Sequence, residues 1–318
     1  MAGGKWISDL TATTPLADAA RRVLTVRLEL VRDFLPLALR DWDKDPEHVH
    51  QLRVSTRRAR AALDIFASCL PPREYRAARK LLRRVRRAAG EARDWDVFLA
   101  SLNGEEPRPS PRHRAGRDFL LSYAFAHRLL AQTHLEETSR LYPFSFDRFL
   151  AETVAAVHAP LAAGRRTLID LALPMLSSLV GELERAAAGD LNDYQHLHQV
   201  RIFGKRLRYA MEVFADCFDP SFREQLYPAV EEMQDILGRA NDSHVAVVRL
   251  EALAAHLEIL LPRQWKRFKP GIMGWLRFHE GRLVQEQQHF RKWWRHWQKS
   301  GGNAAFGELL KMREGPAA

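Results

Sequence analysis

The chain has 318 residues, of which 46% are hydrophobic, and a formal net charge of +10 at pH 7. This composition is that of a globular protein, and the length allows either two domains or one large duplicated domain. Only two cysteines occur, which excludes a disulfide framework. No apolar run reaches the length of a membrane span and the N-terminus lacks a signal-peptide core, so we expect a cytoplasmic protein without a membrane partner.

Helical periodicity covers most of the chain and strand signals are scarce, so the sequence predicts an all-α fold. In chain order, helices are expected at about 16–39, 45–71, 73–102, 117–141, 144–157, 165–188, 194–217, 221–256 and 270–300, followed by a short amphipathic segment at about 304–312. Asp45 and Asp193 are the expected N-caps of the second and seventh helices. Four helices in each half of the chain are typical of two four-helix bundles.

A long internal repeat relates the two halves. The segment His48–Pro72 (HVHQLRVSTRRARAALDIFASCLPP) returns 148 residues later, without a gap, as His196–Pro220 (HLHQVRIFGKRLRYAMEVFADCFDP), and 11 of the 25 positions are identical. A repeat at one fixed offset indicates two copies of one supersecondary unit, which we expect to face each other across a pseudo-two-fold axis. The predicted organisation is an N-terminal tail at 1–15, a first helical bundle at 16–160, a second bundle at 161–300 and a C-terminal tail at 301–318.

The repeated helix carries a basic face. Residues advance by about 100° along a helix, so spacings of 3, 4 and 3 place four polar side chains within an arc of about 80°. In the first copy these are His50, Arg53, Arg57 and Arg60, and in the second His198, Arg201, Lys205 and Arg208. Arg58 and Arg206 lie off this face, where they either reach a second wall of a groove or face water.

The simplest alternative is a solvated charged surface, which usually mixes acids with bases. Neither His48–Ala62 nor His196–Ala210 contains an acid, and like charges one turn apart repel each other. Because this arrangement occurs twice at matching positions, we predict a basic groove or pore that binds a polyanion. A second-ranked wall follows on the next helix of the first copy only: Arg76, Lys80, Arg83 and Arg87.

The pattern His48-x-His50-x-x-Arg53-x-x-x-Arg57-Arg58-x-Arg60, followed by Gly90-Glu91-Ala92-Arg93-Asp94, resembles the CHAD family of histidine-bearing α-helical domains. The second copy has the similar stretch from His198 to Arg208, with Asn241-Asp242 after it, so the resemblance covers essentially the whole chain. It implies two four-helix bundles about a pseudo-two-fold axis and a basic central pore that binds inorganic polyphosphate, in association with polyphosphate granules. The implied ligand residues are the eight of the two basic faces, with Arg58 and Arg206 in addition and Arg83 and Arg87 behind them.

The function predicted from these observations is non-enzymatic binding of inorganic polyphosphate, with no cofactor, no catalytic residue and no metal ligand. Phosphoryl transfer normally needs carboxylate-held metal or a phosphate-cradling glycine loop. The nearest carboxylates, Asp94, Asp96 and Asp242, are better explained as capping and ion-pairing groups. The alternative is a helical protein that binds nucleic acid weakly, through its basic helices and a tryptophan-rich C-terminal helix.

Overall fold

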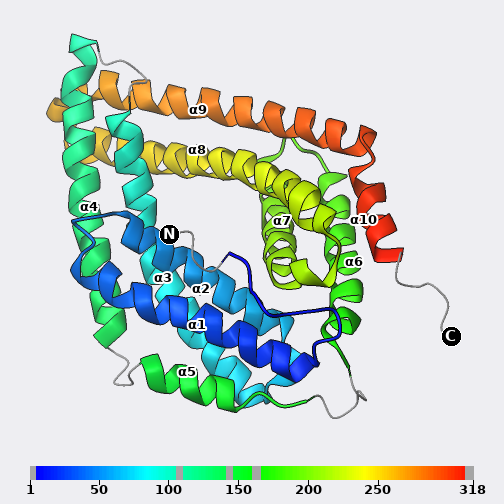
Figure 1. The fold of residues 1–318 in the computed structure, drawn as a ribbon. Coiled ribbons are helices and arrows are strands. Elements are labelled where there is room, and N and C mark those ends of the chain that lie inside the picture. Colours follow the sequence, from blue (N-terminus) through cyan, green and yellow to red (C-terminus); the bar gives the residue numbers. More distant parts are fainter. Residues whose placement is uncertain (1–4, 105–109, 141–145, 160–165, 312–318) are drawn as a thin grey trace.

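The computed structural model describes residues 5–104, 110–140, 146–159 and 166–311 (Figure 1). The described residues form α-helices and no strand, with one isolated β-bridge between Pro15 and Thr167, which confirms the all-α prediction. The predicted boundary between the halves at 160/161 lies outside the described residues. The helices are α1 (Leu16–Arg40), α2 (Glu47–Ile65), α3 (Pro72–Asn103), α4 (Arg114–Arg140), α5 (Phe146–Ala155), α6 (Leu168–Ala187), α7 (Tyr194–Phe214), α8 (Tyr227–Leu260), α9 (Pro262–Lys299) and α10 (Gly302–Lys311).

Of the two predicted N-caps of the repeated helices, Asp193 is confirmed, whereas Asp45 lies one residue before the N-cap of α2, Pro46. Asp193 caps α7 and its carboxylate accepts a hydrogen bond from the backbone N–H of Gln195 at 3.0 Å. In the first copy Asp45 accepts from the backbone N–H of Glu47 at 2.8 Å, although α2 begins only at Glu47, after Pro46. Short polar side chains at these positions satisfy N–H groups that have no partner inside the helix.

The predicted start of the last long helix, near Pro270, is wrong. Helix α9 begins at Pro262 and Pro270 lies in its interior. Pro262 suits the first turn, where its missing N–H costs nothing, whereas Pro270 removes one hydrogen bond from the helix. Packing offsets that loss, because α9 lies so close to α4 that a Cβ on Gly116 would be 2.8 Å from the Cα of Gly271.

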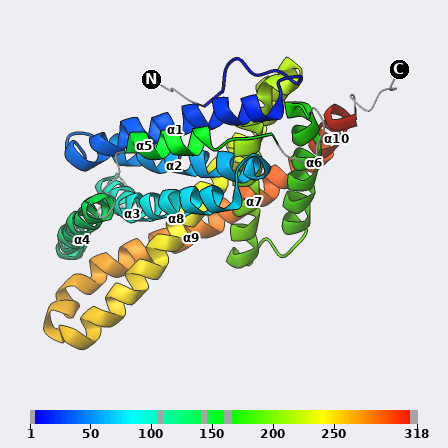
Figure 2. The same cartoon turned by 90° about the horizontal axis from the view of Figure 1, so that it is seen from below.

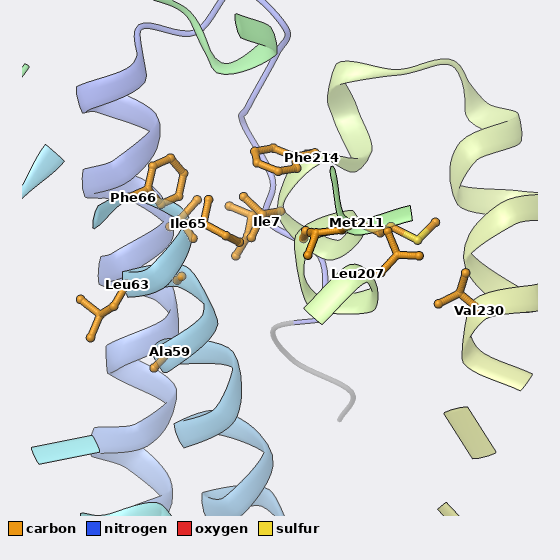
Figure 3. Close-up of a cluster of buried hydrophobic side chains, with 14 of the residues drawn as sticks. Ile7, Ala59, Leu63, Ile65, Phe66, Leu207, Met211, Phe214 and Val230 are labelled. Atoms are coloured by element: carbon orange, nitrogen blue, oxygen red, sulfur yellow. The ribbon is translucent and has the colours of Figure 1, made fainter. Parts of the chain in front are cut away.

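The larger hydrophobic core is shared by both halves of the chain. Figure 3 shows Ala59 and Leu63 of α2 with Phe66 directly after it, and their repeat equivalents on α7, Leu207, Met211 and Phe214. Ile7 of the N-terminal segment lies between the two helices, where it is only 3% exposed. Both cysteines, Cys69 and Cys217, are buried at equivalent positions, as expected for small core residues.

A second core joins the halves again at the opposite end of α3 and α8. It contains Phe98 of α3, Leu120 of α4, Leu250 of α8 and Trp275 of α9, each at most 3% exposed. Figure 2 shows the α8–α9 hairpin running from beside α6 and α10 to beside α4. The two halves therefore hold each other at two separate places, and the basic residues of α2 and α7 lie between them.

No helix among the described residues has both the length and the apolar character needed to cross a membrane.

Candidate functional site

Basic side chains from both repeat copies converge where α2 packs against α7. Lys205 of α7 marks the centre of this group. Its pKa is lowered to about 5 by burial and by the positive charges of four neighbours: Arg201, Arg57, Arg53 and Arg208. The structure thus brings together side chains from the basic faces of both helices. We call these five residues, together with Arg86 of α3, the central cluster.

The central cluster contains donors that the protein does not satisfy. Among the described residues, the buried Nε atoms of Arg57, Arg86, Arg201 and Arg208 have no hydrogen-bond acceptor. The residues that the structure describes also place no carboxylate oxygen within 4.0 Å of four of these side chains: Arg57, Arg86, Arg201 and Lys205. Burying an unpaired cation or an unsatisfied donor is costly, so an anion that supplies oxygen atoms here gains a strong interaction.

A cavity of about 490 Å³ opens beside the central cluster, between α2, α3, α6 and α7. Its basic lining comes from Arg57 and Arg60 of α2, Arg86 of α3, and Lys205 and Arg206 of α7. Such clustering of cations in a recess focuses positive potential and attracts anions. The carboxylate of Asp64 lies at the rim of the cavity, where it accepts hydrogen bonds from Tyr75 and Arg79 at 2.8 Å each.

The two predicted histidines lie in the first turns of α2 and α7. Burial and the charges of Arg93 and Arg57 lower the pKa of His50. Burial and the charges of Arg201 and Lys205 likewise lower the pKa of His198. Both imidazoles are therefore neutral near pH 7 in the free protein, and a bound polyanion would favour their protonation.

Carboxylates flank the central cluster at this histidine end. The Asp94 carboxylate lies 3.2 Å from the guanidinium of Arg53, and both side chains remain partly exposed. Its repeat equivalent, Asp242, acts on Arg201, where it opposes the lowering of the pKa that burial causes. Asp94 is thus an ion-pairing group, as predicted, whereas Asp242 acts on Arg201 without a described contact within 4.0 Å. Both aspartates lie inside helices, so the predicted capping role is wrong.

Arg58 and Arg206 occupy equivalent positions but have different surroundings. Arg58 donates two hydrogen bonds to the fully buried Glu212 of α7, at 2.7 and 2.9 Å. Glu212 also accepts from Tyr227 at 2.9 Å and from Arg27 at 3.4 Å. Arg206 is exposed, lines the cavity and pairs with Glu182. In the free protein Arg58 therefore ties α2 to α7, and only Arg206 is open to the cavity.

The N-terminal segment covers the side of the α2–α7 pair that lies opposite the cavity. Lys5 donates to both carboxylate oxygens of Glu231 at 3.0 Å, and its carbonyl oxygen accepts from Arg27 at 3.0 Å. The Trp6 ring packs edge-on against Tyr227 at 4.7 Å. Glu212 and Tyr227 are the repeat equivalents of Asp64 and Arg79, which border the open cavity. The N-terminal segment, which has no counterpart in the repeat, therefore leaves one side open and covers the other.

Comparisons with known proteins identify the family and the fold of the chain. The family model described as the CHAD domain matches residues 22–251. The chain belongs to the CHAD domain family. A search of curated proteins found no match for it. Among solved structures, the crystal structure of the CHAD domain from the plant Ricinus communis has a TM-score of 0.70 and 26% identity, and covers 91% of this chain and 94% of that one. PptA from Streptomyces chartreusis, with a TM-score of 0.67 and 18% identity over 89% of this chain and 100% of that one, shares the fold.

In this CHAD domain the second-ranked basic residues of α3 are not part of the central cluster, although the positive charge of Arg83 helps to lower the pKa of Arg86. All four are exposed, and none lines the cavity: Arg76, Lys80, Arg83 and Arg87. Arg86 was not singled out from the sequence, yet it is the α3 residue whose pKa is lowered by burial and by Arg60, Arg53 and Arg57. Its signal was the spacing of Tyr75, Arg79 and Arg86, which share a face of α3 distinct from that of the exposed four.

Two acidic residues of α8, Glu232 and Asp235, lie away from the CHAD domain's cavity. Glu232 accepts a hydrogen bond from the Trp293 indole at 3.1 Å, and with Asp235 it lines a separate pocket against α9. Three tryptophans of α9 are at most 6% exposed and serve as core residues: Trp265, Trp275 and Trp294. Within the described part of the chain, no group of three acidic, histidine or cysteine side chains is arranged to hold a metal ion.

Proposed function

We propose that this CHAD domain binds inorganic polyphosphate without carrying out a chemical step, in the cytoplasm and in association with polyphosphate granules. The observation that carries the proposal is the central cluster, with its four unsatisfied guanidinium donors and its Lys205 free of any carboxylate within 4.0 Å among the described residues. Membership of the family supports the choice of ligand class. The architecture we propose is two four-helix bundles, α1–α4 and α6–α9, with the pseudo-two-fold axis passing between α2 and α7.

Polyphosphate suits this cluster because of its simple chemistry. It is a flexible chain with about one negative charge per phosphate, and it has no bases to be read. The protein already holds several cations close together before the ligand binds. The free energy of folding offsets their mutual repulsion, so this cost does not reduce the affinity. Binding then satisfies the unpaired donors with charge-assisted hydrogen bonds and releases condensed counterions.

The ligand residues of the proposal divide by position. The inner set lies in or beside the central cluster and consists of His50, Arg53, Arg57, Arg60, Arg86, His198, Arg201, Lys205 and Arg208. Arg206 extends it along the cavity wall. Arg58 supports the inner set through Glu212, and the exposed face of Arg76, Lys80, Arg83 and Arg87 adds a long-range field.

Nucleic-acid binding is less well supported. Stacking of bases needs exposed aromatic rings, and the tryptophans Trp265, Trp275 and Trp294 are in the core. The cavity beside the central cluster carries basic side chains from α2, α3 and α7, and its two aromatic side chains are tyrosines, Tyr75 and Tyr209. We therefore expect long polyphosphate to displace single-stranded DNA at equal phosphate concentration.

The test is fluorescence anisotropy with labelled long-chain polyphosphate across a salt series. The variant Arg57→Ala/Arg60→Ala/Lys205→Ala/Arg208→Ala removes four basic groups from the site. The control, Lys266→Ala/Arg267→Ala/Arg295→Ala/Lys299→Ala, removes four exposed basic groups from α9. We expect the first to lose at least about 100-fold in affinity, since each charge-assisted contact is worth about 1.5 kcal/mol or more, and the second less than about threefold. Equal losses would mean that the charge acts diffusely, and would overturn the proposal.

A further inference from the structure

A second polar cavity, of about 220 Å³, lies between α3, α8 and α9 at the histidine end of the central cluster. Two of its lining residues contact the site already described. Asp94 pairs with Arg53 at 3.2 Å, and Asn241 accepts a hydrogen bond from the Tyr194 hydroxyl at 3.3 Å, one turn before His198. We call this the α9 cavity. Asp94 and Asn241 therefore connect the α9 cavity to residues beside the central cluster.

Buried His279 is the unusual feature of the α9 cavity. It is only 4% exposed, and neither ring nitrogen has a hydrogen-bond partner among the described residues. Burial and the charge of Arg282 lower its pKa to about 4, so the ring is neutral and offers one donor and one acceptor. Buried polar groups are nearly always satisfied in native proteins, so this side chain indicates a ligand group that carries both acceptor and donor atoms.

The charges around His279 leave a net attraction for an anion. Arg239 is neutralised by Glu286, to which it donates two hydrogen bonds, at 2.8 and 3.0 Å. Asp94 is neutralised by Arg53. Two arginines then remain against the single carboxylate of Asp242. They are Arg249, which is stacked over the Trp95 ring at 3.7 Å, and Arg282, which has no carboxylate within 4.0 Å in the described chain.

The floor of the α9 cavity is formed by buried residues. Phe98 and Ala246 line it and belong to the second hydrophobic core, where each is 3% exposed. Ser243 and His279 also line the buried part of the cavity, where they are 1% and 4% exposed. A ligand that enters the α9 cavity cannot extend through these buried residues into the core. A polar recess with a buried floor beside a basic site fits the end of a chain better than its middle.

We propose that the α9 cavity receives the terminal phosphate group of a polyphosphate chain whose preceding groups lie in the central cluster. This inference rests on the proposed function. A terminal group differs from an internal one by an additional ionisable oxygen, which accepts hydrogen bonds when ionised and donates one when protonated. Arg282 and Arg249 supply the cationic donors, and the neutral imidazole of His279 pairs with either form of the oxygen.

The experiment compares polyphosphate of one defined length in two forms, with free ends and with both terminal groups capped as phosphoramidates. Affinities are measured by calorimetry for the wild type, for Arg282→Ala and for Arg277→Ala, an exposed arginine on the same helix that does not line the cavity. We expect the wild type to bind free-ended chains about tenfold more tightly, which corresponds to one charge-assisted hydrogen bond. Arg282→Ala should abolish this preference, and Arg277→Ala should keep it.

A second variant, His279→Phe, keeps a ring of similar shape and removes both nitrogens. We expect it to lose the preference for free ends, with its fold verified by an unchanged circular-dichroism spectrum. Tight wild-type binding with no preference between the two ligands would overturn the end-binding inference and leave the proposed function standing. An equal loss for both ligands in Arg282→Ala would also overturn it. Failure of the wild type to bind either ligand would overturn the proposed function as well.

Discussion

Lys205 makes binding at the central cluster depend on protons. Its pKa is lowered to about 5 by burial and by the arginines around it, so the free protein holds it as a neutral amine at pH 7. A polyanion that lies against it reverses the balance, because the negative charge favours the ammonium form. Binding should therefore take up a proton at this residue, and affinity should fall as the pH rises.

The magnitude follows from the size of the shift. Protonating Lys205 in the empty site at pH 7 costs about 3 kcal/mol, because the pH is about two units above its pKa and each unit is worth 1.36 kcal/mol. If the bound form holds the proton fully, Lys205 alone lowers the affinity about tenfold per pH unit between about pH 6 and 8. The same shift has the opposite effect on folding. The unfolded chain binds this proton more readily, so the stability of the free protein rises with pH between about 5 and 10.5.

The assay is calorimetry of polyphosphate binding at pH 7 in two buffers of different ionisation enthalpy, which yields the number of protons taken up. Lys205→Met removes the titrating group and keeps the length of the side chain. Lys205→Arg keeps a permanent charge. We expect both variants to take up about one proton fewer than the wild type, and only the arginine variant to keep tight binding. Identical proton uptake in the wild type and Lys205→Met would refute the reasoning.

Three further predictions concern the same elements. With five to eight phosphate contacts, the slope of log K against log salt should lie at about −3.5 to −5.6, and a slope shallower than about −1 would contradict a multivalent site. Arg58→Ala should cost about 3–5 kcal/mol in urea unfolding because it leaves the buried Glu212 with less compensation, whereas the exposed equivalent Arg206→Ala should cost less than about 1 kcal/mol; equal costs would argue against the covered side described above. Binding should tighten from about pH 7.5 to 6 as His50 and His198 become protonated, and a His50→Ala/His198→Ala variant that keeps the whole pH effect in the Lys205→Met background would exclude them as ligand groups.

Much of the site could be predicted because the repeat and the helical period are both visible in the sequence. Spacings of 3, 4 and 3 placed Arg53 and Arg57 on one face of α2, and the fixed offset assigned Arg201 and Lys205 to the matching face of α7. Burial was not visible in the same way. Helix α3 is basic on several faces, and only its packing against α2 selects Arg86 for the central cluster.

The difference between Arg58 and Arg206 was hidden for another reason. Each has an acid at the equivalent position of the opposite copy, Glu212 for Arg58 and Asp64 for Arg206. Only the first pair forms, because a segment outside the repeat, Lys5 to Ile7, packs over Glu212 and Tyr227 and buries them. Aligning the two repeat copies shows only the residues that they share. The effect of a non-repeated segment that packs on one copy cannot be seen in that alignment.

This asymmetry also explains how α2 and α7 remain together although both present cations to each other. On the covered side, Glu212 accepts hydrogen bonds from Arg58 and Arg27, and the shared core continues with Ile7 between the helices. On the open side no comparable ion pair joins the two helices among the described residues, and Arg57 and Lys205 keep their groups free for a ligand. If Arg206 paired with Asp64 as Arg58 pairs with Glu212, the Asp64 carboxylate would neutralise part of the positive charge of the cavity. The covered side therefore supplies the stability that lets the open side hold unpaired positive charge.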